Sequence, residues 1–167
     1  MIRKTNNYLY KLLLYVIMQI KSVFDNGEKI PVKYTTDGVN VNPPLEITDI
    51  PNGAKTIVLI VDDPDAQRVV GYTWVHWIRY NIPVYEDNLK IEENSLPGIE
   101  GLSTYKYEKY GGPNPPKGSG IHRYYFKIYA LNSNLNLKMG TNLKELEKAM
   151  EEHIIDKAEL IGIYGRD

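Results

Sequence analysis

Cysteine is missing from the chain, and its absence removes several kinds of chemistry. A disulfide framework, a thiolate nucleophile and a zinc or iron–sulfur site held by cysteine are all excluded. A chain of 167 residues is long enough to bury a hydrophobic core without such supports. The absence also fits a reducing compartment, so we expect a cytoplasmic protein, and nothing in the sequence calls for a cofactor.

An excess of charge of one sign is missing as well. The chain has 20 basic and 21 acidic residues, which give a formal net charge of -1. Binding to a phosphate backbone needs a surplus of basic side chains on one surface, so nucleic acid is not expected as a partner. The length and the apolar content of 43% are typical of one globular domain.

The sequence also has no apolar run long enough to cross a membrane. The run at residues 12–18 is much shorter than the roughly 20 residues that a transmembrane helix needs. No small-residue cleavage site follows it, as a signal peptide would require. We interpret residues 1–17 as an extension, with Met18 as a candidate initiator, and residues 18–167 as the domain. A docked extension and a targeting or anchoring segment remain open alternatives.

Strand signals dominate the rest of the sequence. Residues 56–61 form a β-branched, apolar run that predicts a strand buried on both faces, and Pro64 prevents its ladder from continuing. Further strands are predicted at 74–82, 122–131 and 160–164. Proline, glycine and asparagine are common in the connections between them, as expected for turns.

One helix is predicted late in the chain. Apolar residues recur at helical spacing over residues 143–154, and Asn142 is placed to cap the first turn. A succession of strands followed by a single helix favours antiparallel sheets over alternating βαβ units. We therefore expect a mainly β fold, arranged as a sandwich with Greek-key links.

Two of the predicted strands carry histidine on a face that is otherwise largely apolar. Strict alternation places on one face of the first strand Trp74, His76, Ile78 and Tyr80. It places on one face of the second strand His122, Tyr124, Phe126 and Ile128. Both faces begin polar and become apolar, as expected for strands that line a cavity with a polar mouth. Each histidine taken alone is also explained as a hydrogen-bonded core or surface residue.

Asp63 and Asp65 flank Pro64 where the buried strand ends. Either aspartate alone is explained as a residue that caps a turn beside proline. A carboxylate that reaches a histidine would instead fix the imidazole tautomer and stabilise its charged form. An imidazolium together with the Tyr124 hydroxyl would then donate hydrogen bonds to a phosphate or carboxylate oxygen.

The loop at residues 110–120 is rich in glycine, which allows close backbone approach to a ligand, and in proline, which stiffens a loop. It lacks the order of a phosphate-binding P-loop, because glycine rather than serine or threonine follows Lys117. It contains Ser119 but no nucleophile elbow, because Lys117 and Ile121 stand where that motif needs glycine.

Four motifs follow one another along the chain. They are Asp63-Pro64-Asp65-Ala66, then Trp74-Val75-His76-Trp77 with Tyr80-Asn81-Ile82-Pro83, then Gly112-Pro113-Asn114-Pro115-Pro116-Lys117-Gly118, and then Gly120-Ile121-His122-Arg123-Tyr124. In these motifs, and over about residues 23–166, the chain resembles the phosphatidylethanolamine-binding protein family, whose mammalian members are the Raf kinase inhibitor proteins. The resemblance is greatest to the bacterial and archaeal branch.

The resemblance implies a large central antiparallel sheet packed on a smaller one, with a ligand pocket. The residues that match the family's pocket are Asp63, Asp65, Trp74, His76, Pro115, His122 and Tyr124. The implied ligand is phosphate, a phospholipid head group such as phosphoethanolamine, or a carboxylate. Because members of the family modulate kinases and serine proteases and many prokaryotic members are homodimers, the resemblance implies a protein kinase, a serine protease or a second copy as a partner.

We therefore expect a binding protein with no catalytic residues and no metal. Two enzymatic alternatives stay open. The two histidines and two aspartates of these motifs could act as ligands in a metal-dependent hydrolase. Ser119 and His122 could instead serve as nucleophile and base of a serine hydrolase.

Overall fold

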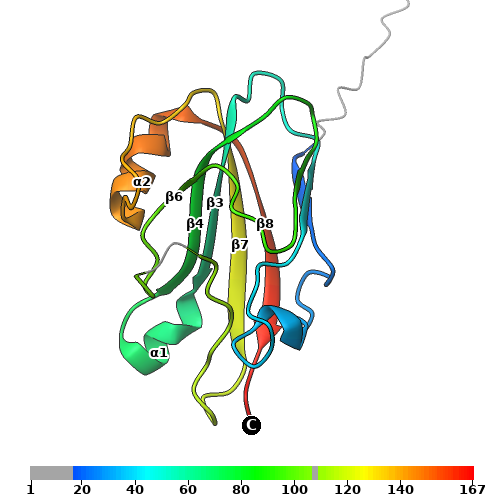
Figure 1. Cartoon of the computed structure of the whole chain (residues 1–167), viewed down its shortest axis with the longest axis vertical. Coiled ribbons are helices and arrows are strands. Elements are labelled where there is room, and N and C mark those ends of the chain that lie inside the picture. The colour runs from blue at the N-terminus through cyan, green and yellow to red at the C-terminus, as the bar shows by residue number, and fades with distance from the viewer. Residues whose placement is uncertain (1–16, 107–108) are drawn as a thin grey trace, which may run out of the picture.

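A five-stranded antiparallel sheet runs through the middle of the molecule in the computed structural model, which describes residues 17–106 and 109–167 (Figure 1). The strands lie in the order β6-β4-β3-β7-β8. Their bounds are Thr56–Asp63 for β3, Trp74–Pro83 for β4, Ile99–Glu100 for β6, His122–Leu131 for β7 and Ile154–Tyr164 for β8. After β4 and β6 the chain returns to place β7 beside β3, which is a Greek-key arrangement.

A smaller antiparallel sheet packs on one face of the large sheet (Figure 1). Its strands, in the order β1-β2-β5, are Gln19–Lys21, Leu45–Thr48 and Leu89–Ile91. Between the sheets, Ile47 of β2 belongs to one buried cluster with Leu59 of β3 and Phe126 of β7. The expected mainly β fold, with a large antiparallel sheet packed on a smaller one, is confirmed.

Helix α2, Leu143–Met150, covers the opposite face of the large sheet (Figure 1). Leu146 of α2 belongs there to a second buried cluster with Val58 of β3. The predicted N-cap is confirmed, because Oδ1 of Asn142 accepts a hydrogen bond from the backbone N–H of Glu145 at 3.0 Å. The shorter helical segments are α1 at Gln67–Val70 and 3-10 turns at Val32–Tyr34 and Pro64–Ala66.

Helix α2 is shorter, and the last strand longer, than the sequence predicts. The helix gives way to a 3-10 turn at Glu151–His153, and Ile154 already begins β8. Strand β8 pairs with β7 along its length, from Leu131 opposite Ile154 to His122 opposite Tyr164. An isoleucine at helical spacing also fits the alternation of a strand, so pairing with a distant part of the chain fixed this boundary.

Strict alternation fails along β4, because the strand contains a β-bulge at His76. Residues 61 and 62 of β3 pair with residues 77 and 75 of β4, which leaves His76 as the extra residue. Beyond the bulge the two faces exchange places: Trp77 joins the core between the sheets, whereas Ile78 and Tyr80 pack in the cluster beneath α2. The prediction that Ile78 and Tyr80 share a face with His76 is therefore wrong.

The expectations for the N-terminal extension fall on residues 1–16, which lie outside the described residues, and on Ile17, which is exposed. Met18 is buried, and its backbone N–H donates to Oδ2 of Asp156 at 3.2 Å. The division into residues 1–17 and 18–167 stays a prediction. Among the helices that the structure describes, none has the length and apolar character to cross a membrane.

Candidate functional site

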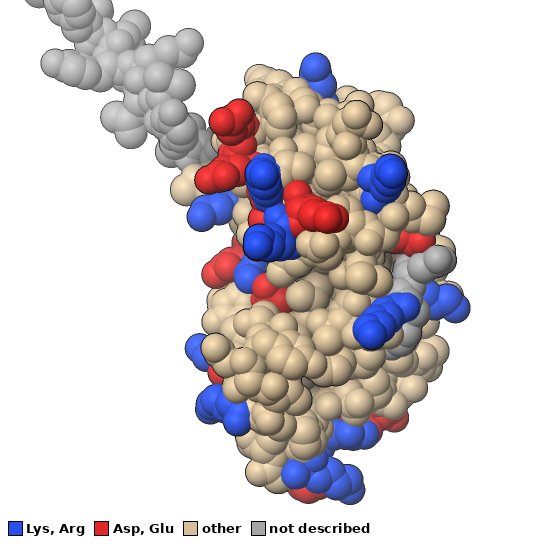
Figure 2. Space-filling view, turned by 90° about the vertical axis from the view of Figure 1, so that its left-hand side faces the viewer, with Lys and Arg blue, Asp and Glu red and all other residues tan. Residues whose placement is uncertain are grey.

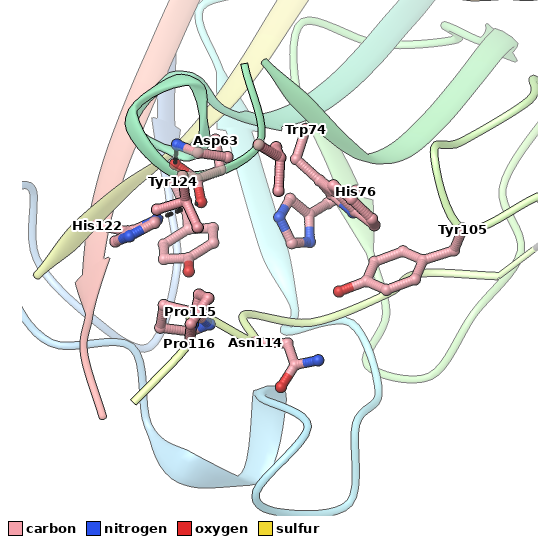
Figure 3. A pocket seen from close by; sticks show the side chains of 12 residues that line it. Asp63, Trp74, His76, Tyr105, Asn114, Pro115, Pro116, His122 and Tyr124 are labelled. Carbon is pink, nitrogen blue, oxygen red and sulfur yellow. Dashed lines mark hydrogen bonds and ion pairs between the residues drawn. The ribbon is translucent and has the colours of Figure 1, made fainter. Parts of the chain in front are cut away.

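A cavity of about 340 Å³, whose lining side chains are drawn in Figure 3, lies at the end of the large sheet where β3 ends and where β4 and β7 begin. Antiparallel pairing explains this position, because the last residue of β3, Asp63, pairs with the first residue of β4, Trp74. Helix α1, which follows β3, contributes to one wall, and the loop at residues 110–120 contributes to another. Segments that are far apart in the sequence thus meet at one end of the fold.

Six of the seven residues that the sequence predicts for a ligand site line this cavity, namely Asp63, Trp74, His76, Pro115, His122 and Tyr124. The remaining lining residues among those described are Ala66, Val69, Val70, Tyr105, Asn114 and Pro116. The walls are therefore mostly apolar and aromatic, with a few polar groups that converge on one space, as is common for small-molecule sites.

Asp63 and His122 form a buried hydrogen-bonded pair in which each polar side-chain atom has a partner within the protein. Nδ1 of His122 donates to Oδ2 of Asp63 at 2.7 Å, and Oδ1 of Asp63 accepts from the backbone N–H of Ala66 at 3.0 Å (Figure 3). Nε2 of His122 lies 3.1 Å from Oγ of Ser119, whose hydroxyl is also 2.7 Å from the carbonyl oxygen of Pro116. Neither ring nitrogen of His122 is left over for a ligand.

His76 is held as a neutral ring with a fixed tautomer. Its Nδ1 lies 2.6 Å from the carbonyl oxygen of Gly111, which can only accept, so Nδ1 carries the proton. Burial lowers the pKa of His76 to about 4, because desolvation outweighs the hydrogen bond to Gly111. The structure therefore favours a neutral imidazole here in place of the expected imidazolium, and Nε2 is left as a hydrogen-bond acceptor.

Tyr124 places a buried hydroxyl at the cavity. The side chain is 1% exposed, and its hydroxyl has no hydrogen-bond partner among the described residues. Its ring meets that of His76 edge to face, with centroids 5.2 Å apart. Burial and the nearby carboxylate of Asp63 raise the pKa of Tyr124, so the hydroxyl keeps its proton and can donate.

Asp65, the seventh predicted residue, does not line the cavity. The 3-10 turn after β3 directs its carboxylate to Arg123, whose Nε and Nη2 lie 2.8 Å and 2.9 Å from its oxygens. The backbone N–H of Arg123 also donates to Asp65 at 3.0 Å. The side-chain hydrogen bond from Arg123 lowers the pKa of Asp65 to about 2. In this structure Asp65 fastens the turn to β7.

Sequence reasoning missed Tyr105, which covers the aromatic side of the cavity. Its ring packs edge to face on Trp74, with centroids 5.2 Å apart, and on His76, with centroids 5.6 Å apart. Tyr105 lies in the connection after β6, where no strand or motif marked it. The only sequence signal for this residue was that the chain has 14 tyrosines, and that number does not indicate which of them would line a cavity.

Among the described residues, the side chains that could coordinate a metal ion do not come together at one place. No group of three or more His, Asp or Glu side chains there is arranged to hold a metal ion. The carboxylate of Asp65 is hydrogen-bonded to Arg123, and the carboxylate of Asp63 is hydrogen-bonded to His122. The two histidines and two aspartates therefore do not form the ligand set that a metal-dependent hydrolase would need.

Away from the cavity, the charged side chains are scattered. Figure 2 shows the side of the molecule that carries α1 and α2, where basic and acidic side chains lie interspersed among uncharged ones. Such a face differs from the broad basic surface that binds a phosphate backbone. The expectation that nucleic acid is not a partner stays a prediction.

Comparison with known proteins gives matches over most of the chain. The sequence matches the family model described as phosphatidylethanolamine-binding protein over residues 20–165. A UPF0098 protein of Pyrococcus horikoshii is 48% identical over 155 residues, which cover 89% of this chain and 77% of that protein.

Two solved structures are similar to the fold described above. A phosphatidylethanolamine-binding protein homolog from Chlamydia trachomatis is 41% identical, with a TM-score of 0.81, and the match covers 90% of this chain and 99% of that one. YbcL of E. coli, described as a new member of the mammalian PEBP family, is 26% identical, with a TM-score of 0.80. That match covers 91% of this chain and all of the other.

Proposed function

Because the chain belongs to the phosphatidylethanolamine-binding protein family, in its bacterial and archaeal branch, we propose that it is a ligand-binding modulator protein. The protein binds a small anionic ligand, which is a phosphate, a phospholipid head group such as phosphoethanolamine, or a carboxylate. The ligand occupies the cavity at the end of the large sheet. The protein works in the cytoplasm by binding rather than by catalysis.

The observation that carries this proposal is the buried hydroxyl of Tyr124, which lines the cavity and has no partner among the described residues. A buried hydroxyl without a hydrogen bond costs about 1–3 kcal/mol, and an anionic ligand oxygen would remove that cost. Nε2 of His76 lies on the neighbouring ring and offers a second polar contact. These two groups give a ligand a defined orientation between apolar walls.

We further propose that an occupied cavity modulates a protein kinase or a serine protease. Family membership supports this step, and so does the apolar rim of the cavity. Val69 and Val70 of α1 line the cavity and are nevertheless 44% and 42% exposed. Tyr72, also exposed, stacks on Trp74 with centroids 6.0 Å apart. A partner that covers this rim would contact the ligand beneath it.

One observation favours a second candidate, a serine hydrolase. Ser119, His122 and Asp63 form a hydrogen-bond chain with distances of 3.1 Å and 2.7 Å, as a nucleophile, base and carboxylate would. Against it, the Ser119 hydroxyl is within 2.7 Å of a carbonyl oxygen, and the nucleophile elbow is missing. A fluorophosphonate probe that labels the protein, but not Ser119→Ala, would favour the hydrolase.

Isothermal titration calorimetry with phosphoethanolamine tests the binding proposal. Tyr124→Phe should weaken binding about 10- to 100-fold, because a hydrogen bond to a charged group contributes about 1.5–3 kcal/mol. Tyr85→Phe is the matched control, since Tyr85 is 89% exposed and does not line the cavity. Absence of binding to the unchanged protein, or equal affinity in both variants, would contradict the proposal.

A further inference from the structure

The polar groups of the cavity that a ligand can contact include Nε2 of His76, the hydroxyl of Tyr124 and the indole N–H of Trp74, of which the last two have no partner among the described residues. They differ in kind. Because Nδ1 of His76 donates to Gly111, Nε2 carries a lone pair and accepts a hydrogen bond. The hydroxyl of Tyr124 keeps its proton and donates. A ligand that satisfies these groups must present a donor to His76 and acceptors to Tyr124 and to the indole N–H of Trp74.

The charge of the cavity limits the ligand in a second, independent way. No lysine or arginine is among the described residues that line it, and the one carboxylate there is that of Asp63. Arg123 lies close in sequence to this site, but its guanidinium is bound to Asp65. A doubly charged anion would therefore lose its hydration without a fixed positive charge to replace it, which is costly in an apolar site.

We propose that the cavity selects a phosphate monoester in its singly protonated, monoanionic form. The P–OH group donates to Nε2 of His76, and the hydroxyl of Tyr124 donates to an unprotonated phosphate oxygen. This inference rests on the proposed function and adds to it the protonation state of the ligand and the two residues that discriminate it. No bond is made or broken, and the proton enters with the ligand.

The surroundings of His76 keep the shared proton on the phosphate. Four titratable side chains face the ring from the elements packed against it: Asp63 from β3, His122 and Tyr124 from β7, and Tyr105 from the connection after β6. The carboxylate of Asp63 raises the pKa of His76, but desolvation has the larger effect and lowers it to about 4. The second pKa of a phosphate monoester is about 6, so the phosphate holds the proton more strongly.

Calorimetric titration of the full chain at pH 5 to pH 8 tests this inference with two probes. The phosphate of phosphoethanolamine can carry the proton, whereas the sulfate group of its analogue, 2-aminoethyl hydrogen sulfate, has one negative charge and no proton, and both probes carry the same ammonium group. The affinity for phosphoethanolamine should fall about 100-fold from pH 5 to pH 8, because its monoanionic fraction falls by that factor. About one proton should be taken up per ligand at pH 8 and close to none at pH 5, as measured in buffers of different ionisation enthalpy.

The sulfate probe examines the P–OH contact directly. At pH 5 the phosphate group and the sulfate group each carry one negative charge and both probes carry one ammonium group, yet the sulfate should bind at least tenfold more weakly, because it cannot donate to Nε2 of His76. His76→Gln should reduce this preference to within about twofold, since its amide can donate as well as accept. Circular dichroism checks that this variant folds. Tyr124→Phe should weaken the binding of both probes and leave the preference for the phosphate probe unchanged.

The outcomes separate this inference from the function on which it rests. If neither probe binds at any pH, both are overturned. If phosphoethanolamine binds with a flat profile from pH 5 to pH 8, or if the sulfate binds equally well at pH 5, the cavity is an anion site but does not select the protonated monoester. If His76→Gln keeps the full preference for phosphate, another group accepts the P–OH proton and the assignment to His76 is wrong.

Discussion

Asp63 and His122 form a hydrogen bond of 2.7 Å although 59 residues separate them in the chain. Their side chains are 5% and 2% exposed, so the pair is almost completely removed from water. The bond joins the end of β3 to the beginning of β7 and thereby holds together two sides of the cavity. Its burial makes both partners sensitive to loss of the other, because a buried polar atom without a partner is costly.

Replacement of Asp63 should therefore affect stability as well as binding. Asp63→Asn keeps the size of the side chain but removes the charge that His122 contacts. We expect the free energy of unfolding, measured by urea titration at pH 7, to fall by about 1–3 kcal/mol. Asp87→Asn is the matched control at an exposed position and should change it by less than about 0.5 kcal/mol. Equal stabilities of the two variants would show that the pair does not support the fold.

Burial of His76 should make stability depend on pH. Desolvation lowers the pKa of this group to about 4 in the folded protein, whereas an unfolded histidine has a pKa of about 6.5. The unfolded chain thus binds the proton first, so the stabilisation is complete above about pH 6.5 and is lost as the pH falls towards 4. Urea titrations at pH 7 and pH 4.5 should differ by roughly 2–3 kcal/mol.

The contribution of His76 can be separated from that of other groups. His76→Gln has no proton to gain in this range, so its free energy of unfolding should change less between pH 7 and pH 4.5 than that of the unchanged protein. The same slope in both proteins would assign the pH dependence to a different residue. It would also remove the support that the depressed pKa gives to a neutral ring.

Asp65 should matter for stability and not for ligand binding. Its pKa is lowered to about 2, chiefly by the Arg123 hydrogen bond, so its stabilisation is present above about pH 4 and is lost as the pH falls towards 2. Because the Arg123 side chain is 54% exposed, water screens the pair, and Asp65→Asn should cost only about 1 kcal/mol at pH 7. The affinity for phosphoethanolamine should stay within about twofold of that of the unchanged protein. A large loss of affinity would show that Asp65 contributes to the ligand site.

Local sequence patterns were sufficient where burial follows a regular pattern along an element, alternating in β7 and continuous in β3. Strand β7 begins and ends where predicted, at residues 122 and 131, and β3 contains the whole predicted run at 56–61. Both runs are bounded by turn-forming residues, and β3 is buried at every position. In such segments the local preference and the tertiary environment agree, so either one alone indicates the strand.

Local sequence patterns did not predict the structure where contacts with a distant part of the chain determine it. The bulge at His76 depends on the register between β3 and β4, and it moves Ile78 to the opposite face. The early start of β8 at Ile154 depends on pairing with β7. Asp65 turns to Arg123 rather than to the cavity because a 3-10 turn follows β3 at once. None of these contacts is local in the sequence.

By itself, the sequence determined the fold class, the family and six of the residues that line the cavity, because apolar periodicity and ordered motifs are carried by neighbouring residues. Only the tertiary structure decided which atoms of those residues a ligand can reach. Hydrogen bonds to Asp63 and Ser119 engage the two nitrogens of His122, the bond to Gly111 engages Nδ1 of His76, and the hydroxyl of Tyr124 has no partner among the described residues. The direction of a hydrogen bond depends on where its partner lies in space, and no local pattern records that position.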